Sequence, residues 1–376
     1  MSAVVVGVHL EHRGLSGAAI GAALAIGLAT ASLSGLLSAA LAARIGRRAA
    51  LSLTGLLMAV TGLDLALAPQ PALLLAAGLT GMLGLASLDL GPFAALEQAL
   101  LAETVPGRGR NRAFARYSLS GALAGAAGGL VAAAAGVIGT NAIFAVYAAL
   151  GVLTAGLPLL LSSASEPADA SGPVLGNIRP LAGLAALFML DSFGGGLVAN
   201  AVIAYWLHAR FGADPSVLGP VLAAVALLQA ASYEVSGRLA DRVGLINTMV
   251  WTHLPSNLLL LLVPFSVNLP MAVALLLARF CLSQMDVPAR QAYIVSIVRP
   301  SERAGAVATT GALRGVTQAF GPAIAGAAIQ SAAYGLPFVL GGAVKIVYDL
   351  GLYAGFRARK AEHELARAPE VKQERG

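Results

Sequence analysis

The chain has 376 residues, of which 58% are hydrophobic and 11% are charged, and its mean hydropathy is +0.80. Soluble domains carry roughly 25% charged residues, so this composition excludes a soluble globule, and its hydrophobicity excludes intrinsic disorder. A single cysteine, Cys281, excludes an internal disulfide. The composition therefore predicts a polytopic membrane protein.

Eleven apolar stretches are long enough to cross a bilayer as helices. In chain order they cover residues 15–43, 48–68, 71–103, 110–137, 140–161, 179–207, 215–240, 244–266, 269–298, 303–331 and 335–356. Backbone polar groups in hydrocarbon must be satisfied internally, and no stretch alternates as a barrel strand does, so we predict an all-α fold. Residues 1–10 are apolar but too short to span, and they lack the basic segment of a secretory signal.

Positive charges are distributed unevenly between the connections. Of the 24 Lys and Arg residues, eighteen lie in one alternating set of connections, whereas the opposite set holds Arg13 and Arg210. The positive-inside rule makes the first set cytoplasmic, and the C-terminus belongs to it. We therefore expect a multi-pass protein of the cell inner membrane. The net charge of +6 follows from this topology, and no aromatic-interleaved basic surface predicts nucleic-acid binding.

The sequence repeats itself once. Residues 14–51 align without a gap with residues 212–249, and GPFAALEQALLAETVPGRGR (91–110) resembles DVPARQAYIVSIVRPSERAG (286–305). A duplicated helical order predicts two bundles, and transporters built in this way hold substrate near the midplane between them. We divide the chain into an N-terminal bundle (1–161), a cytoplasmic linker (162–178), a C-terminal bundle (179–357) and a cytoplasmic tail (358–376).

The repeat leaves the span 179–207 without a complete partner, because its counterpart would begin before Met1. The expectation is a first helix that is largely missing, with a true start roughly 20 residues upstream, one helix length being about 20 residues. A genuine eleven-helix variant is the alternative.

Short motifs in both halves resemble the major facilitator superfamily. GRLADRVG (237–244) matches the cytoplasmic signature of that family, and its first-half copy ALAARIGRR (40–48) keeps Arg44, Gly46 and Arg47 but has Ala43 in place of the aspartate. FGPAIAG (320–326) resembles a late Gly-Pro motif, whereas GALAGAAGG (121–129) keeps the glycines without the proline that accompanies antiport. The resemblance implies an efflux-type transporter of two pseudo-symmetric six-helix bundles, with the first helix truncated.

The resemblance implies that the missing first helix and the spans 71–103, 179–207 and 269–298 line a central cavity. It also implies that one bundle rocks against the other around a fixed site. Ionisable groups at membrane depth are costly and point to function, and polar groups on these spans supply the proton or substrate candidates. These candidates are Asp191, Phe193 and Asn200 on one span, Asp89 on another, and Gln284 and Asp286 on the third.

A second group of residues predicts gates at the cytoplasmic end. In the second half, Arg290 is expected to meet Asp241, although Asp286 lies four residues before Arg290 and allows an intrahelical pair instead. In the first half the gate must differ, and we expect Glu97 to meet Arg44. The remaining gating candidates are Gly237, Arg242, Gly244 and Gly46; glycine at 244 permits a tight reversal.

Other polar residues within the spans have less specific interpretations. Lys345 and Asp349 are four apart on the last span, which we expect to be peripheral, so they should neutralise each other, as Glu234 and Arg238 should. His253 precedes Pro255 and is expected to be a satisfied histidine in a kinked helix.

Two further cations, Arg279 and Arg314, have no obvious partner in the sequence. Each fits an anionic ligand or a buried acid, and the sequence does not decide between them.

The chain has no phosphate-binding G-x-x-x-x-G-K-[ST] loop, no H-E-x-x-H and no G-x-S-x-G. We therefore expect no enzyme activity, no cofactor and no metal. The function predicted is alternating-access transport of a small amphipathic molecule, as proton-coupled efflux by a monomer in the lipid bilayer. A metabolite facilitator or importer, and an inactive membrane protein lacking its first helix, remain alternatives.

Overall fold

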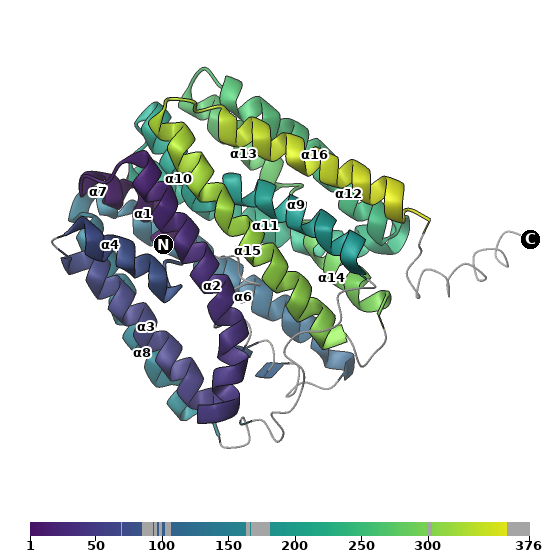
Figure 1. Ribbon diagram of the computed structural model, residues 1–376, viewed down its shortest axis with the longest axis horizontal. Helices are drawn as coiled ribbons and strands as arrows, with labels where there is room; N and C mark the ends of the chain where they lie inside the picture. The colour runs from purple at the N-terminus through teal and green to yellow at the C-terminus, as the bar shows by residue number, and fades with distance from the viewer. Residues whose placement is uncertain are drawn as a thin grey trace, which may run out of the picture.

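A computed structural model of the chain describes residues 1–68, 70–84, 93, 96–97, 100–101, 107–162, 166, 181–298 and 303–358. All regular secondary structure in this part of the chain is helical (Figure 1), and eight helices are long and apolar enough to cross a membrane. The predicted all-α fold is confirmed.

The helices form two consecutive sets. The first set is α1 (Ser2–His12), α2 (Gly17–Ile45), α3 (Arg47–Leu67), α4 (Pro71–Ala77), α6 (Gly107–Ala133), α7 (Ala135–Ile138) and α8 (Thr140–Gly156). The second set is α9 (Ala182–Leu197), α10 (Asn200–Phe211), α11 (Pro215–Val243), α12 (Leu245–Leu262), α13 (Leu269–Phe280), α14 (Asp286–Ser296), α15 (Arg303–Gln330) and α16 (Leu336–Phe356). Short 3-10 turns cover Gly78–Thr80, Leu157–Leu160 and Val263–Phe265.

The internal repeat seen in the sequence recurs in the helix boundaries. Helices α2 and α11 begin and end 198 positions apart, and α1 and α10 begin at the same offset. Each long helix ends at a glycine with a positive φ of 87°, Gly46 in the first half and Gly244 in the second. Because a side chain at that φ is strained, these two glycines set equivalent reversals before α3 and α12.

Equivalent residues also cap the two long helices at their start. The Ser16 side chain accepts a hydrogen bond from the Ala19 amide of α2, and Asp214 accepts from the amides of Ser216 and Val217 in α11. The hydrogen bond from the Ser216 hydroxyl, followed by those from the two backbone amides, holds the pKa of the Asp214 carboxyl below its usual range.

Ser16→Ala and Asp214→Ala are each expected to lower the free energy of unfolding by about 1 kcal/mol, the usual contribution of an N-cap. A carboxyl whose pKa is depressed in the folded state stabilises above its unfolded pKa and loses that contribution as pH falls. The Asp214→Ala difference should therefore shrink in acid, whereas the Ser16→Ala difference should not. Thermal unfolding of both variants in detergent at neutral and acidic pH tests this, and equal pH dependence would contradict it.

Three spans that the sequence predicts as continuous are broken in the structure. The span 179–207 divides into α9 and α10 at Val198 and Ala199, and the span 269–298 divides into α13 and α14 over residues 281–285. In the span 71–103, α4 and its 3-10 turn end at Thr80, before two glycines, Gly81 and Gly84, with positive φ. Broken helices expose backbone polar groups and are tolerated at membrane depth where they line a cavity.

Two seams of small residues join the halves. Helix α2 packs along α15, where a Cβ on Gly21 would clash with the Pro322 carbonyl oxygen and lie 2.8 Å from the Gly326 Cα. Helix α6 packs along α11, where a Cβ on Gly129 would lie 2.9 Å from the carbonyl oxygen of Gly219. Gly21 and Gly219 are equivalent in the repeat, so the two seams occupy equivalent positions in the two halves. Backbones can approach this closely because glycine has no side chain.

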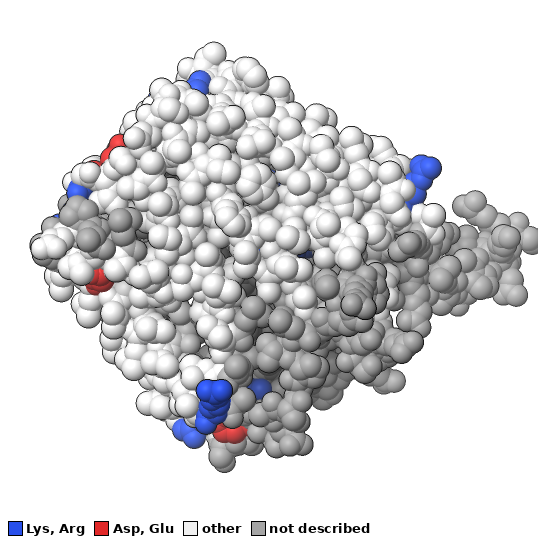
Figure 2. Space-filling model, viewed as in Figure 1, with Lys and Arg blue, Asp and Glu red and all other residues white. Residues whose placement is uncertain are grey.

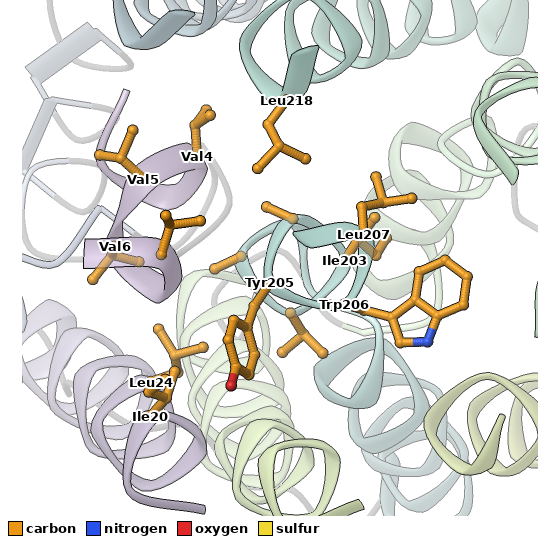
Figure 3. Close-up of a cluster of buried hydrophobic side chains, with 14 of the residues drawn as sticks. Val4, Val5, Val6, Ile20, Leu24, Ile203, Tyr205, Trp206, Leu207 and Leu218 are labelled. Carbon is orange, nitrogen blue, oxygen red and sulfur yellow. The ribbon is translucent and has the colours of Figure 1, made fainter. Parts of the chain in front are cut away.

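The halves touch at the end of the bundle near Arg13 and Arg210, which we call the closed end. An apolar cluster fills the contact and includes valines of α1, Ile203 and Trp206 of α10 and Leu218 of α11 (Figure 3). The Ala18 amide of α2 donates to the Gln330 side chain of α15 at 2.8 Å. His208 Nε2 of α10 lies 3.2 Å from a Glu11 carboxylate oxygen of α1. From this end, α2 and α15 diverge toward Ile45 and Arg303 (Figure 1).

Charged side chains lie at the margins of the face seen in Figure 2, and a broad uncharged area separates them. Large apolar side chains such as Leu56, Val152 and Trp251 are more than half exposed. Side chains of this kind are favourable against lipid and unfavourable against water, so the exposed surface of the described helices fits a bilayer.

Candidate functional site

A cavity of about 320 Å³ lies between the halves, in the size range of small-molecule sites. Broken helices supply much of its wall, because α9, α13 and α14 contribute Asp191, Arg279 and Arg290. Helices α6 and α11 contribute Ala122, Leu222, Ala226 and several glycines of α6 to the wall, together with two polar side chains of α11, Gln229 and Tyr233.

Asp191 is the centre of the charged wall. Its carboxylate accepts hydrogen bonds from Lys345 Nζ at 2.6 Å and from Arg290 Nη1 at 3.3 Å, and His253 Nε2 lies 3.7 Å away. Arg290 Nη1 also donates to Asp286 at 2.8 Å. The Asp191 side chain is 6% exposed. A buried charge is tolerated when it is paired and hydrogen-bonded, and Asp191 holds α9, α14 and α16 together in this way.

A second carboxylate lies behind the first. Asp349 of α16 is fully buried and accepts hydrogen bonds at 2.8 Å from Asn257 Nδ2, while its other oxygen lies 2.8 Å from His253 Nδ1. The two ring nitrogens of His253 therefore face two carboxylates, Asp349 and Asp191. This arrangement links the cavity surface to a group in the interior of the second half through one imidazole.

Asp349→Leu is expected to destabilise the fold, because it leaves the buried Asn257 amide and His253 Nδ1 without this acceptor, and each buried polar group left unsatisfied costs about 1–3 kcal/mol. Asp349→Asn keeps the volume and one acceptor oxygen, so it should lose less. Thermal unfolding in detergent measures both. The control is Glu234→Gln, because the exposed Glu234–Arg238 pair at 3.0 Å should contribute less than about 1 kcal/mol. Equal losses in all three variants would contradict the role of Asp349.

Two more arginines lie in the wall. Arg314 of α15 donates from Nε to the Ser192 hydroxyl at 3.1 Å. Arg279, in the last turn of α13, is 5% exposed and has its Cζ 4.7 Å from the centre of the Phe280 ring. Its Nε and Nη1 have no hydrogen-bond partner among the described residues.

Four of the six proton or substrate candidates predicted from the sequence line the cavity, namely Asp191, Asn200, Gln284 and Asp286. Phe193 does not; it packs against the apolar cluster of the closed end. The reason is helical geometry, since residues two apart do not share a face, and Asp191 occupies the cavity face. The sixth candidate, Asp89, lies outside the described residues.

The gating candidates lie toward the other end of the bundle. Arg44 and Arg242 are exposed in the last turns of α2 and α11, next to Gly46 and Gly244. The predicted Glu97–Arg44 pair is not formed between these two described side chains; Glu97 accepts a hydrogen bond from Tyr117 at 2.7 Å.

For the second-half gate, Arg290 contacts Asp286, the intrahelical alternative, together with Asp191. Gly237 and Asp241 belong to α11, but the Asp241 side chain lies outside the described part, so its pairing with Arg290 stays a prediction.

The expected Lys345–Asp349 pair is wrong. Lys345 binds Asp191 on α9, and Asp349 binds His253 and Asn257 on α12. Helix α16 packs against both of these helices, so the inward face of this outer helix is buried rather than peripheral. His253 is satisfied, as expected, and also lines the cavity. Sequence spacing indicates only a possible partner within the same helix. The actual partners of Lys345 and Asp349 lie about 100–150 positions away in the chain.

Comparison with known proteins gives a consistent picture. The sequence pattern of the Major Facilitator Superfamily matches residues 1–181 and again residues 181–375. The uncharacterized membrane protein YJR124C of Saccharomyces cerevisiae is 23% identical over 358 residues, covering 83% of this chain and 80% of the yeast protein.

Solved structures of low sequence identity share the fold. The nucleoside transporter NupG superposes with a TM-score of 0.77 at 14% identity, covering 94% of this chain and 96% of that one. The D-xylose-proton symporter gives 0.70 at 16%, covering 94% and 92%. A bacterial homolog of the human lysosomal transporter Spinster, inward-facing and unoccupied, gives 0.71 at 17%, covering 96% and 95%. The two family matches span nearly the whole chain, and it belongs to the Major Facilitator Superfamily.

Proposed function

We propose that the protein is a secondary active transporter that moves a small amphipathic molecule out of the cell by proton-coupled alternating access, as a monomer in the inner membrane. The observation that carries this proposal is the cavity between the halves, whose charged wall centres on a buried carboxylate held by groups from other helices. The family and fold point to a transporter rather than an enzyme.

Alternating access is supported by the asymmetry between the two ends of the bundle. The halves meet at the closed end through the α1–α10 contact, and α2 and α15 diverge toward the other end. With the orientation predicted by the positive-inside rule, the cavity faces the cytoplasm in this state. The opposite state requires the cytoplasmic ends to meet, and we assign that contact to Asp241 with Arg290 and to the residues around Arg44, Gly46, Glu97, Gly237, Arg242 and Gly244.

Proton coupling is supported by the position of Asp191. Protonation would remove the charge that Lys345 and Arg290 now neutralise, and it would weaken the contacts that hold α16 and α14 to α9. Loss of those contacts changes the relative stability of the two states, which is the requirement for coupling. Asp89 is a second protonation candidate. The D-xylose-proton symporter carries proton coupling on the same fold.

The test is substrate-dependent pH change in proteoliposomes, screened over a broad set of compounds. For at least one compound, we expect protons to move across the membrane in the direction opposite to the compound. Transport that persists after the proton gradient has been collapsed would favour a facilitator, and co-directional movement would favour an importer. No movement of any compound by a folded, reconstituted protein would overturn the proposal.

A further inference from the structure

The strongest unexplained feature of the cavity is Arg279. This side chain is 5% exposed and lines the cavity, and its Nε and Nη1 donors have no acceptor in the part of the chain that the structure describes. Asp191 interacts with it electrostatically but is already bound by Lys345 and Arg290. A buried guanidinium without a hydrogen-bonded partner is unfavourable, so folding alone does not account for it.

A second buried group lies four residues further along the chain. The Ser283 hydroxyl lines the cavity, is buried, and also has no hydrogen-bond partner among the described residues. It belongs to the break between α13 and α14, as does Gln284, whose amide oxygen accepts from Tyr233 at 3.2 Å. The last turn of α13 and the break that follows it therefore place two unused donors on the cavity wall, the Arg279 guanidinium and the Ser283 hydroxyl.

The cavity wall carries an excess of positive charge, which favours an anionic ligand. Four cationic side chains line the cavity, Arg279, Arg290, Arg314 and Lys345, against two carboxylates, Asp191 and Asp286. If Asp349, the neighbour of His253, is counted as well, the described side chains still carry one more positive than negative charge when the histidine is neutral. One negative charge from a ligand would balance the site.

We propose that the transported molecule is an organic monocarboxylate, whose carboxylate accepts hydrogen bonds from the Arg279 guanidinium and from the Ser283 hydroxyl. Hydrogen bonds between a guanidinium and a carboxylate are charge-assisted and stronger than neutral ones. The apolar body of the molecule lies against small or apolar residues of α6 and α11, which include Ala122, Leu222 and Ala226. The inference rests on the proposed transport function and names the substrate class of the same cavity.

The experiment compares carboxylates with their neutral amides on the purified full chain in lipid nanodiscs. The probes are hexanoate, benzoate and indole-3-acetate, each beside its amide, with inorganic phosphate as a separate arm, and the readout is a saturable rise in melting temperature. At least one carboxylate should bind about tenfold or more tightly than its amide. Equal binding within every pair, or stabilisation by phosphate alone, would overturn the proposal.

Variants locate the site. Arg279→Gln should weaken carboxylate binding about tenfold or more, Arg279→Lys less, and Ser283→Ala a few-fold. Without ligand, Arg279→Gln should melt no lower than the parent, because it removes an unpaired buried charge. Arg357→Gln, an exposed cation outside the cavity, is the control. If Arg279→Gln does not fold, the other two variants decide, and unchanged carboxylate binding in them overturns the assignment.

Transport measurements distinguish a failure of the carboxylate proposal from a failure of the proposed transport function. Uptake or release of a neutral or cationic compound that Arg279→Gln leaves unchanged would keep the transporter and reject the carboxylate. Carboxylate binding that depends on Arg279, with no movement of any compound, would keep the binding site and reject transport.

Discussion

Asp191→Asn is expected to abolish proton-coupled transport while leaving the protein in the membrane. The substitution keeps the shape of the side chain but removes the charge that Lys345 and Arg290 neutralise. Leaving a buried cation without its counter-charge costs about 3–5 kcal/mol of folding free energy, so the melting temperature should fall. Because an amide at this position cannot exchange a proton, substrate-dependent pH change in proteoliposomes should fall to the level of liposomes without protein.

A double variant separates the structural effect from the coupling effect. Lys345→Met removes the cation that Asp191→Asn leaves unpaired, so Asp191→Asn combined with Lys345→Met should recover most of the lost stability, as contacting residues are non-additive. Coupled transport should not recover, because no group at this position can exchange a proton. Glu234→Gln is the matched acid-to-amide control. A compound moved equally well by Asp191→Asn would remove this carboxylate from the mechanism.

The fold follows from sequence patterns that are local or repeated. Apolar length predicts the spans, and the offset between Gly14 and Gly212 predicts the duplication that the matching bounds of α2 and α11 confirm. The breaks in the helices are harder to predict from the sequence, because they line a cavity that forms only when the two halves are assembled. The predicted span 71–103 shows this, since Gly81 and Gly84 have positive φ although both lie in an apolar run.

The site is predictable as far as each polar residue can be assigned to a cavity-lining helix. Asp191, Gln284 and Asp286 satisfy that condition, and they line the cavity as the sequence predicts. Lys345 and Asp349 do not satisfy it. Their spacing of four residues predicts a pair within α16, and the sequence contains no signal for their actual partners on α9 and α12.

Gly326→Leu is expected to prevent the halves from meeting at the closed end. A Cβ at Gly326 would clash with the Gly17 carbonyl oxygen and lie 2.6 Å from the Gly21 Cα, which is backbone and cannot rotate away. Overpacking of this kind costs about 1–3 kcal/mol or more, which shifts the equilibrium roughly 10–100-fold toward states in which this seam is open. Transport should fall by a similar factor, because both states must be visited in each cycle.

Accessibility of a single thiol measures that shift directly. On a Cys281→Ser background, the thiol of Leu24→Cys lies in the buried cluster of the closed end and should resist a membrane-impermeant maleimide applied from that side. Adding Gly326→Leu should make it react. Gly355→Leu is the control, because nothing lies within 4 Å of a Cβ at that exposed position. Equal protection of the thiol in both variants would mean that the seam tolerates the added side chain. Helices α2 and α15 could then separate further without a change of state. In that case the close approach of Gly21 and Gly326 would have no part in the transport cycle.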